Sequence, residues 1–172
     1  MAERMELTRP VFFVGFMGAG KTSVARRLAR TCGVASVDMD TYIERREGKK
    51  VKEIFAEGGE EGFRAIETDV LRELGAKPDP LLISCGGGIV KRPENLWALH
   101  QNGVILFIDR PVDALAVGGG RPLSSSMDAL RQMEAQRRPL YLAAADAVIP
   151  NNGTLDDALH AAMEALDEIF DS

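Results

Sequence analysis

The chain has 172 residues and a formal net charge of −5 at pH 7, with 45% apolar and 27% charged residues. This balance suits a single globular domain over residues 1–172. It does not favour nucleic acid or an anionic membrane surface as a partner. No apolar run approaches the roughly 20 residues of a membrane span, and the N-terminus lacks a signal-peptide pattern. We therefore expect a cytoplasmic protein with neither kind of partner.

Short apolar runs predict five β-strands. The runs are Val11–Val14, Val34–Val37, Leu81–Ser84, Val104–Ile108 and Ala147–Ile149. The first, third and fourth are almost continuously apolar, which is typical of parallel strands covered on both faces.

Segments with a helical period lie between the strands. The expected helices are Lys21–Cys32, Glu60–Leu74, Pro93–Gln101 and Leu155–Phe170. Gly33 and Gly75 can end the first two helices in the left-handed conformation, and Thr154 suits the N-cap of the last. The alternation predicts an α/β fold with three layers, α/β/α, around a five-stranded parallel sheet, with ligand sites at the carboxyl ends of the strands.

The segment Val112–Met127 is rich in Gly and Ser and lies between a predicted strand and a helix. Two interpretations stay open: a solvated connecting loop, or a mobile lid over a ligand.

A phosphate-binding loop follows the first strand. Gly15–Thr22 matches G-x-x-x-x-G-K-[ST], with an apolar strand before it and an amphipathic helix after it. Glycines let successive backbone N–H groups point at phosphate oxygens, and the helix N-terminus adds its positive end. Lys21 can contact the β- and γ-phosphates, and the Thr22 hydroxyl can ligate Mg²⁺. The expected ATP site comprises Gly18, Ala19, Gly20, Lys21, Thr22 and Ser23.

A P-loop alone leaves a GTPase, an ATPase motor and a small-molecule kinase open. The chain has no N-K-x-D motif for guanine and no D-x-x-G switch, and it is too short for the machinery of a motor. A small-molecule kinase is therefore the favoured class.

Two carboxylates follow the second strand, at Asp38 and Asp40. Residues two apart in a strand point to the same side, so both can face one site. The alternative is that Asp40 or Thr41 caps a helix over Thr41–Glu47. The spacing favours a functional role for both carboxylates over a capping role. Asp38 would hold Mg²⁺ through water, and Asp40 would accept the proton of an attacking hydroxyl.

With further motifs in order along the chain, the sequence resembles the shikimate kinases, in the fold group of the nucleoside monophosphate kinases. The motifs are GFMGAGKT at Gly15–Thr22, DMD at Asp38–Asp40, IFAEGGEEGFRAIE at Ile54–Glu67, SCGGGIV at Ser84–Val90, RPL at Arg121–Leu123 and RRPLY at Arg137–Tyr141. The GEEGFR run and the triple glycine are far more specific than the P-loop.

The resemblance implies a shikimate site. Arg64 and Arg137 would bind the substrate carboxylate, for which the planar guanidinium fork is suited. Glu67 shares a helix face with Arg64 and would fix both Arg64 and a substrate hydroxyl. The pocket would be lined by Gly86, Gly87 and Gly88.

The resemblance also implies roles on the ATP side. Arg121 would close with the lid over the transferring phosphoryl group and would contribute to ATP binding and catalysis, together with Lys21 and Asp40. Ser84 would support the metal ligands. Thr22 and Asp38 are the implied metal residues, with Mg²⁺ as cofactor.

The implied reaction is ATP-dependent phosphorylation of the 3-hydroxyl of shikimate, a step towards chorismate and the aromatic amino acids, by a monomer. Gluconate or a nucleoside monophosphate stays open as the acceptor. The paired arginines Arg64 and Arg137 favour a compact carboxylate over a nucleotide. A regulatory module without catalysis is the third alternative, although both halves of a reaction site are retained.

The chain departs from the family beside the lid. Many shikimate kinases have an Arg-Thr pair where this chain has Ala114–Val117, and Gly118–Gly120 replaces more polar residues. Adenine would then be held weakly, or by Pro150–Thr154 on the other side of its pocket. We therefore expect a raised KM for ATP.

Overall fold

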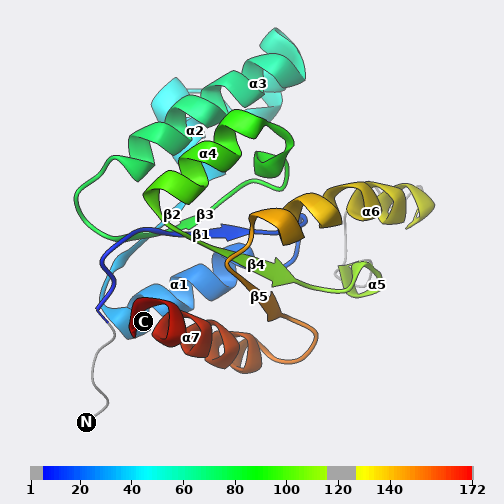
Figure 1. The fold of residues 1–172 in the computed structure, drawn as a ribbon. Helices are drawn as coiled ribbons and strands as arrows, with labels where there is room; N and C mark the ends of the chain where they lie inside the picture. The colour runs from blue at the N-terminus through cyan, green and yellow to red at the C-terminus, as the bar shows by residue number, and fades with distance from the viewer. Residues whose placement is uncertain (1–5, 116–126, 172) are drawn as a thin grey trace.

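Five parallel strands form the centre of the fold in the computed structural model, which describes residues 6–115 and 127–171 (Figure 1). The strands are β1 (Val11–Val14), β2 (Ala35–Asp38), β3 (Leu81–Ser84), β4 (Val104–Asp109) and β5 (Ala147–Pro150). Their order across the sheet is β2-β3-β1-β4-β5, and all neighbouring pairs are parallel. The predicted three-layer α/β/α fold with a five-stranded parallel sheet is confirmed.

Helices cover both faces of this sheet (Figure 1). They are α1 (Lys21–Cys32), α2 (Met39–Glu47), α3 (Val51–Gly75), α4 (Pro93–Asn102), α5 (Val112–Leu115), α6 (Met127–Ala144) and α7 (Leu155–Asp171), with a short 3-10 helix η1 (Ile89–Lys91). Alternate residues of β1 point to opposite faces. Phe12 and Val14 pack in a core with α2, α3, α4 and α6. Val11 and Phe13 pack in a second core with α1 and α7.

Two predicted helix ends are confirmed. Gly33 ends α1 in the left-handed conformation, with φ of 71°. At the start of α7, the Asp157 N–H donates to the Thr154 hydroxyl over 3.1 Å, and the Thr154 N–H donates to the Asp157 carboxylate over 3.2 Å. This reciprocal pair satisfies two free donors of the first turn.

The prediction of a helix over Glu60–Leu74 is confirmed in place but wrong about its end. Helix α3 spans Val51–Gly75 as two helical segments that meet at a kink, where Gly59 has a non-helical φ of 67°, and the expected helix is the second segment. Gly75 does not end α3 in the left-handed conformation: the helix includes it, and Ala76 follows in the right-handed conformation. A Cβ at position 75 would lie 2.9 Å from Nδ2 of Asn102. An alanine at position 75 would therefore displace the Asn102 side chain at the end of α4.

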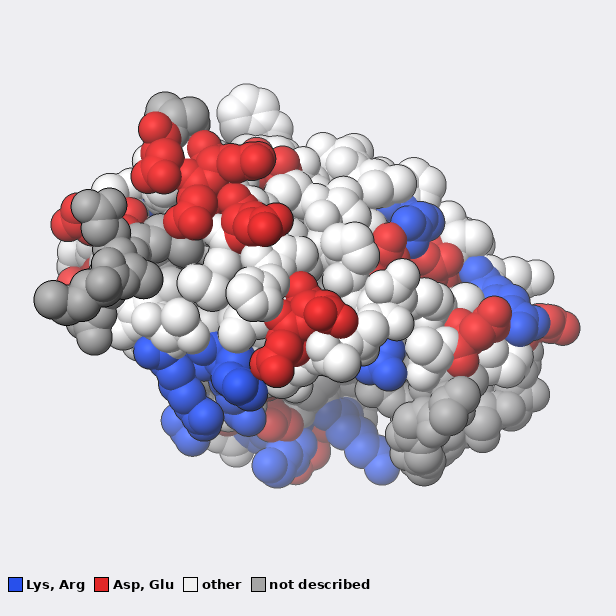
Figure 2. All heavy atoms as spheres, turned by 90° about the horizontal axis from the view of Figure 1, so that it is seen from below, with Lys and Arg blue, Asp and Glu red and all other residues white. Residues whose placement is uncertain are grey.

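The surface is mixed in charge. On the face shown in Figure 2, basic side chains lie in small groups that acidic side chains interrupt. Within residues 6–115 and 127–171, no helix has both the length and the apolar character needed to cross a membrane.

Candidate active site

The P-loop links β1 to α1 and is held by its own lysine. The Lys21 ammonium donates to the Gly15 carbonyl over 2.6 Å and is buried. Burial lowers the pKa of Lys21 to about 8, although nearby acidic groups, Asp40 among them, oppose the shift. Gly15 has φ of 151°, and a Cβ there would lie 2.5 Å from the Ile108 carbonyl oxygen. Glycine is therefore required where the loop crosses the end of β4.

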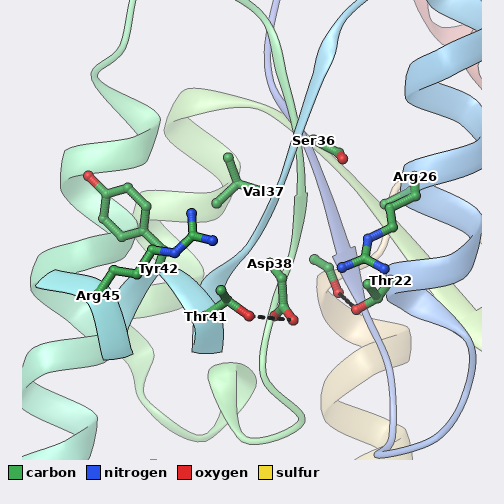
Figure 3. Close-up of a pocket in the computed structure, with 10 residues that line it drawn as sticks. Thr22, Arg26, Ser36, Val37, Asp38, Thr41, Tyr42 and Arg45 are labelled. Carbon is green, nitrogen blue, oxygen red and sulfur yellow. Dashed lines mark hydrogen bonds between the residues drawn. The ribbon is translucent and has the colours of Figure 1, made fainter. Parts of the chain in front are cut away.

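A cavity of about 250 Å³ opens beside the first turn of α1. Thr22 and Asp38 lie on facing sides of it (Figure 3). The hydroxyls of Thr22 and Ser84 are hydrogen-bonded over 3.0 Å, so Ser84 lies directly beside Thr22. A hydroxyl and a carboxylate are suitable ligands for a hard divalent cation, which commonly takes few protein ligands beside substrate phosphates and water.

Asp38 has a second structural role besides the expected contact with a metal ion. It is the N-cap of α2, accepting the Asp40 N–H over 3.2 Å and the Thr41 hydroxyl over 3.2 Å. The alternative in which Asp40 or Thr41 caps this helix is wrong about the residue, because α2 begins two residues before Thr41, at Met39. Each Asp38 oxygen retains a further lone pair, so the cap is compatible with contact to a hydrated cation.

Asp40 lies in the first turn of α2, so the argument from strand alternation was wrong in its premise. The helix nevertheless brings the Asp40 carboxylate close to Gly86 and Glu67. A Cβ built on Gly86 would lie 3.4 Å from an Asp40 oxygen and 3.0 Å from Oε2 of Glu67. Burial raises the pKa of Asp40, and the neighbouring Asp38 carboxylate raises it further, while Lys21 opposes the shift.

The three glycines after β3 bring the predicted acceptor residues together. A Cβ at Gly88 would lie 2.2 Å from Nη2 of Arg64, and one at Gly87 would lie 3.3 Å from Nη1 of Arg137. The same Gly87 position is 3.5 Å from the backbone nitrogen of Met17. The two guanidinium groups therefore approach one backbone segment, beside the P-loop.

Arg64 is fixed by Glu67 on the same face of α3. Arg64 Nη1 donates to Glu67 Oε1 over 2.9 Å, and the Glu67 side chain is fully buried. The second oxygen, Oε2, is buried and has no hydrogen-bond partner among the described residues. Burial raises the pKa of Glu67, and Arg64 opposes that shift. A free acceptor beside an arginine suits a substrate that offers hydroxyls near a carboxylate.

Arg137 projects from α6, where its guanidinium carbon lies 5.9 Å from the centre of the Phe16 ring. One turn further along, the Tyr141 hydroxyl donates to the Gly87 carbonyl. This bond anchors the glycine segment to α6. Tyr141 is the last residue of the RRPLY motif, which was the only signal in the sequence for this contact.

Some predicted site residues either lie outside the described residues or are not among those near Gly86–Gly88. Arg121, Gly118–Gly120 and most of the predicted lid lie outside the described residues. The lid region 112–127 is helical at its beginning, where α5 spans Val112–Leu115. Ser23 is exposed in the first turn of α1. Within the described parts of the chain, no cluster of three or more His, Cys, Asp or Glu side chains could hold a metal by itself.

Comparison with known proteins decides between the kinases of this fold. The family model described as shikimate kinase matches residues 17–169. The chain belongs to the shikimate kinase family. The shikimate kinase of Nostoc sp. is 44% identical over 138 residues, which cover 76% of this chain and 75% of the relative. The shikimate kinase of Symbiobacterium thermophilum is 40% identical over 168 residues, covering 92% and 96%.

Solved structures agree with this assignment. The shikimate kinase from Acinetobacter baumannii, solved in complex with shikimate, superposes with a TM-score of 0.82 at 34% identity, covering 95% of this chain and 93% of that one. The predicted resemblance to shikimate kinases and the predicted kinase class are thereby confirmed.

Proposed function

We propose that this chain transfers the γ-phosphoryl group of ATP to the 3-hydroxyl of shikimate, giving ADP and shikimate 3-phosphate. The observation that carries the proposal is the convergence of Asp40, Glu67, Arg64 and Arg137 on Gly86–Gly88, directly beside the P-loop. Shikimate has one carboxylate and three hydroxyls. The cluster offers two cations and two carboxylates, so its chemistry complements this substrate.

On the donor side, the P-loop N–H groups and Lys21 bind the phosphates. Thr22 is proposed to ligate Mg²⁺ directly and Asp38 through water, with Ser84 holding the Thr22 hydroxyl in place. Bound there, Mg²⁺ supplies charge stabilisation to the phosphoryl oxygens. A buried Lys21 with a pKa near 8 is kept charged by phosphate, because an adjacent anion favours its protonated form.

On the acceptor side, Arg64 and Arg137 are proposed to bind the shikimate carboxylate. Charge-assisted hydrogen bonds of this kind contribute about 1.5–3 kcal/mol each. Glu67 holds the Arg64 fork in place over 2.9 Å, and its free Oε2 is proposed to accept a substrate hydroxyl. The Arg64–Glu67 pair would therefore fix the orientation of the shikimate ring relative to the P-loop.

Asp40 is the proposed base. As the bond from the 3-hydroxyl oxygen to the γ-phosphorus forms and the bond to the ADP oxygen breaks, the hydroxyl proton passes to the Asp40 carboxylate. Burial and Asp38 raise the pKa of Asp40 above its ordinary value, which makes it a stronger base. Arg121 remains the predicted lid residue for the charge on the transferring group, and the monomeric, cytoplasmic state remains a prediction.

A coupled assay of ADP release tests this function against its alternatives. Shikimate, gluconate and nucleoside monophosphates are compared as acceptors at saturating ATP and Mg²⁺. Stimulation by shikimate alone is expected, and Arg137→Ala should raise the KM for shikimate more than that for ATP. Stimulation by gluconate instead would favour the second acceptor, and no stimulation by any acceptor would favour a non-catalytic module.

A further inference from the structure

The end of β5 contacts the P-loop through a buried amide that the catalytic scheme does not use. Asn151 is only 9% exposed, and its Nδ2 donates to the Ala19 carbonyl over 2.7 Å. The two residues are 132 positions apart in the chain. The same Nδ2 would lie 2.6 Å from a Cβ at Gly20, where φ is 97°. Asn151 therefore lies against the peptide that joins Ala19 to Gly20.

The hydrogen bond from Asn151 to the Ala19 carbonyl determines where the backbone N–H of Gly20 points. The described residues contain no cis peptide bonds, and in a trans peptide the C=O and the following N–H point in opposite directions. Holding the Ala19 oxygen towards Asn151 consequently directs the Gly20 N–H away from Asn151. A P-loop binds phosphate through such backbone N–H groups, so the orientation of this peptide matters for the donor site.

Asn151 is itself held on a rigid support. Its backbone N–H donates to the Asp109 carbonyl at the end of β4 over 2.7 Å. The Asp109 carboxylate accepts both terminal nitrogens of Arg138 on α6, over 2.8 and 2.6 Å. A side chain that projects from a backbone anchored in this way can hold a loop in one position.

We propose that Asn151 is a positioning residue for the phosphate donor, holding the Ala19–Gly20 peptide in its phosphate-binding orientation. It acts through the loop and needs no contact with ATP. The inference rests on the proposed function only in requiring that the P-loop bind the phosphates of ATP.

The test compares two ligands that share phosphates but not adenine: ADP and inorganic tripolyphosphate, each with Mg²⁺. Asn151→Leu removes the donor while nearly keeping the shape and adding no charge. The dissociation constants of both ligands should rise together by about fivefold or more, the equivalent of one ordinary hydrogen bond. The KM for shikimate should stay unchanged. Gln101→Leu makes a similar amide-to-leucine change at an exposed position of α4 and should leave both constants unchanged.

Each other outcome contradicts the proposal. Weaker ADP binding with unchanged tripolyphosphate binding would place Asn151 at the adenine instead. Unchanged binding of both ligands, with only a lower melting temperature, would reduce Asn151 to a packing role. Asn151→Ala provides the same comparison if Asn151→Leu does not fold. Failure of the wild-type chain to bind either ligand would instead contradict the proposed ATP site.

Discussion

We predict that Gly88→Ala weakens shikimate binding and leaves the fold unchanged. The backbone at Gly88 has φ of −95° and ψ of 8°, a turn conformation with negative φ that alanine can also adopt. The added methyl would lie 2.2, 2.5 and 2.7 Å from Nη2, Cζ and Nη1 of Arg64. Those atoms are the far end of a flexible side chain, so the guanidinium must move while the backbone stays. The substitution therefore displaces the proposed carboxylate ligand.

The magnitude follows from the contact that is lost. A charge-assisted contact of about 1.5–3 kcal/mol corresponds to a roughly 10- to 150-fold rise in the KM for shikimate. The KM for ATP should change little, because Arg64 is not part of the P-loop. Gly58→Ala is the control, since a Cβ there meets nothing within 4 Å. A Gly88→Ala enzyme with normal folding and a KM for shikimate near the wild-type value would refute the role of Arg64.

Three other predictions concern the reaction itself. Asp40→Asn should lower kcat on the order of 10²–10⁴, and a loss below about tenfold, measured in steady state, would make Asp40 an orienting residue only. Since Lys21 is protonated below its pKa of about 8 and neutral above it, kcat/KM for ATP should fall as pH rises through about 8; a flat profile to pH 9.5 would contradict this. Ser84→Ala frees the Thr22 hydroxyl and should raise the Mg²⁺ concentration for half-maximal rate about tenfold, and an unchanged Mg²⁺ titration would count against the metal role of Thr22.

The parts of the fold that the sequence could predict are those with local signals. The P-loop combines an apolar strand, a glycine pattern and an amphipathic helix within some twenty residues, and α1 begins and ends where these signals place it. The helical segment of α3 before Gly59 is not expected from the sequence, since the adjacent Gly58 and Gly59 disfavour a helix. Ile54 packs this segment into the core, and the non-helical Gly59 separates it from the expected segment.

The sequence could predict that these residues lie near one another, but not all of their geometry. Asp38 and Asp40 do lie close together, but as the cap and first turn of α2 and not as strand residues. The sequence could not distinguish the two, because an aspartate that caps a helix has the same local sequence as one that follows a strand. The bond from Asn151 to Ala19 joins residues 132 positions apart. No local pattern predicts such a bond, since it depends on β5 lying beside β4 at the sheet edge.

The central claim is that Asp40, Arg64 and Arg137 present the 3-hydroxyl of shikimate to the P-loop. Phosphorus NMR of the chain with ATP, Mg²⁺ and shikimate tests it most directly. The account predicts a new phosphomonoester signal coupled to the hydrogen on carbon 3 of the ring, growing in step with ADP. ADP formation with only inorganic phosphate, or an ester on another hydroxyl, would contradict it.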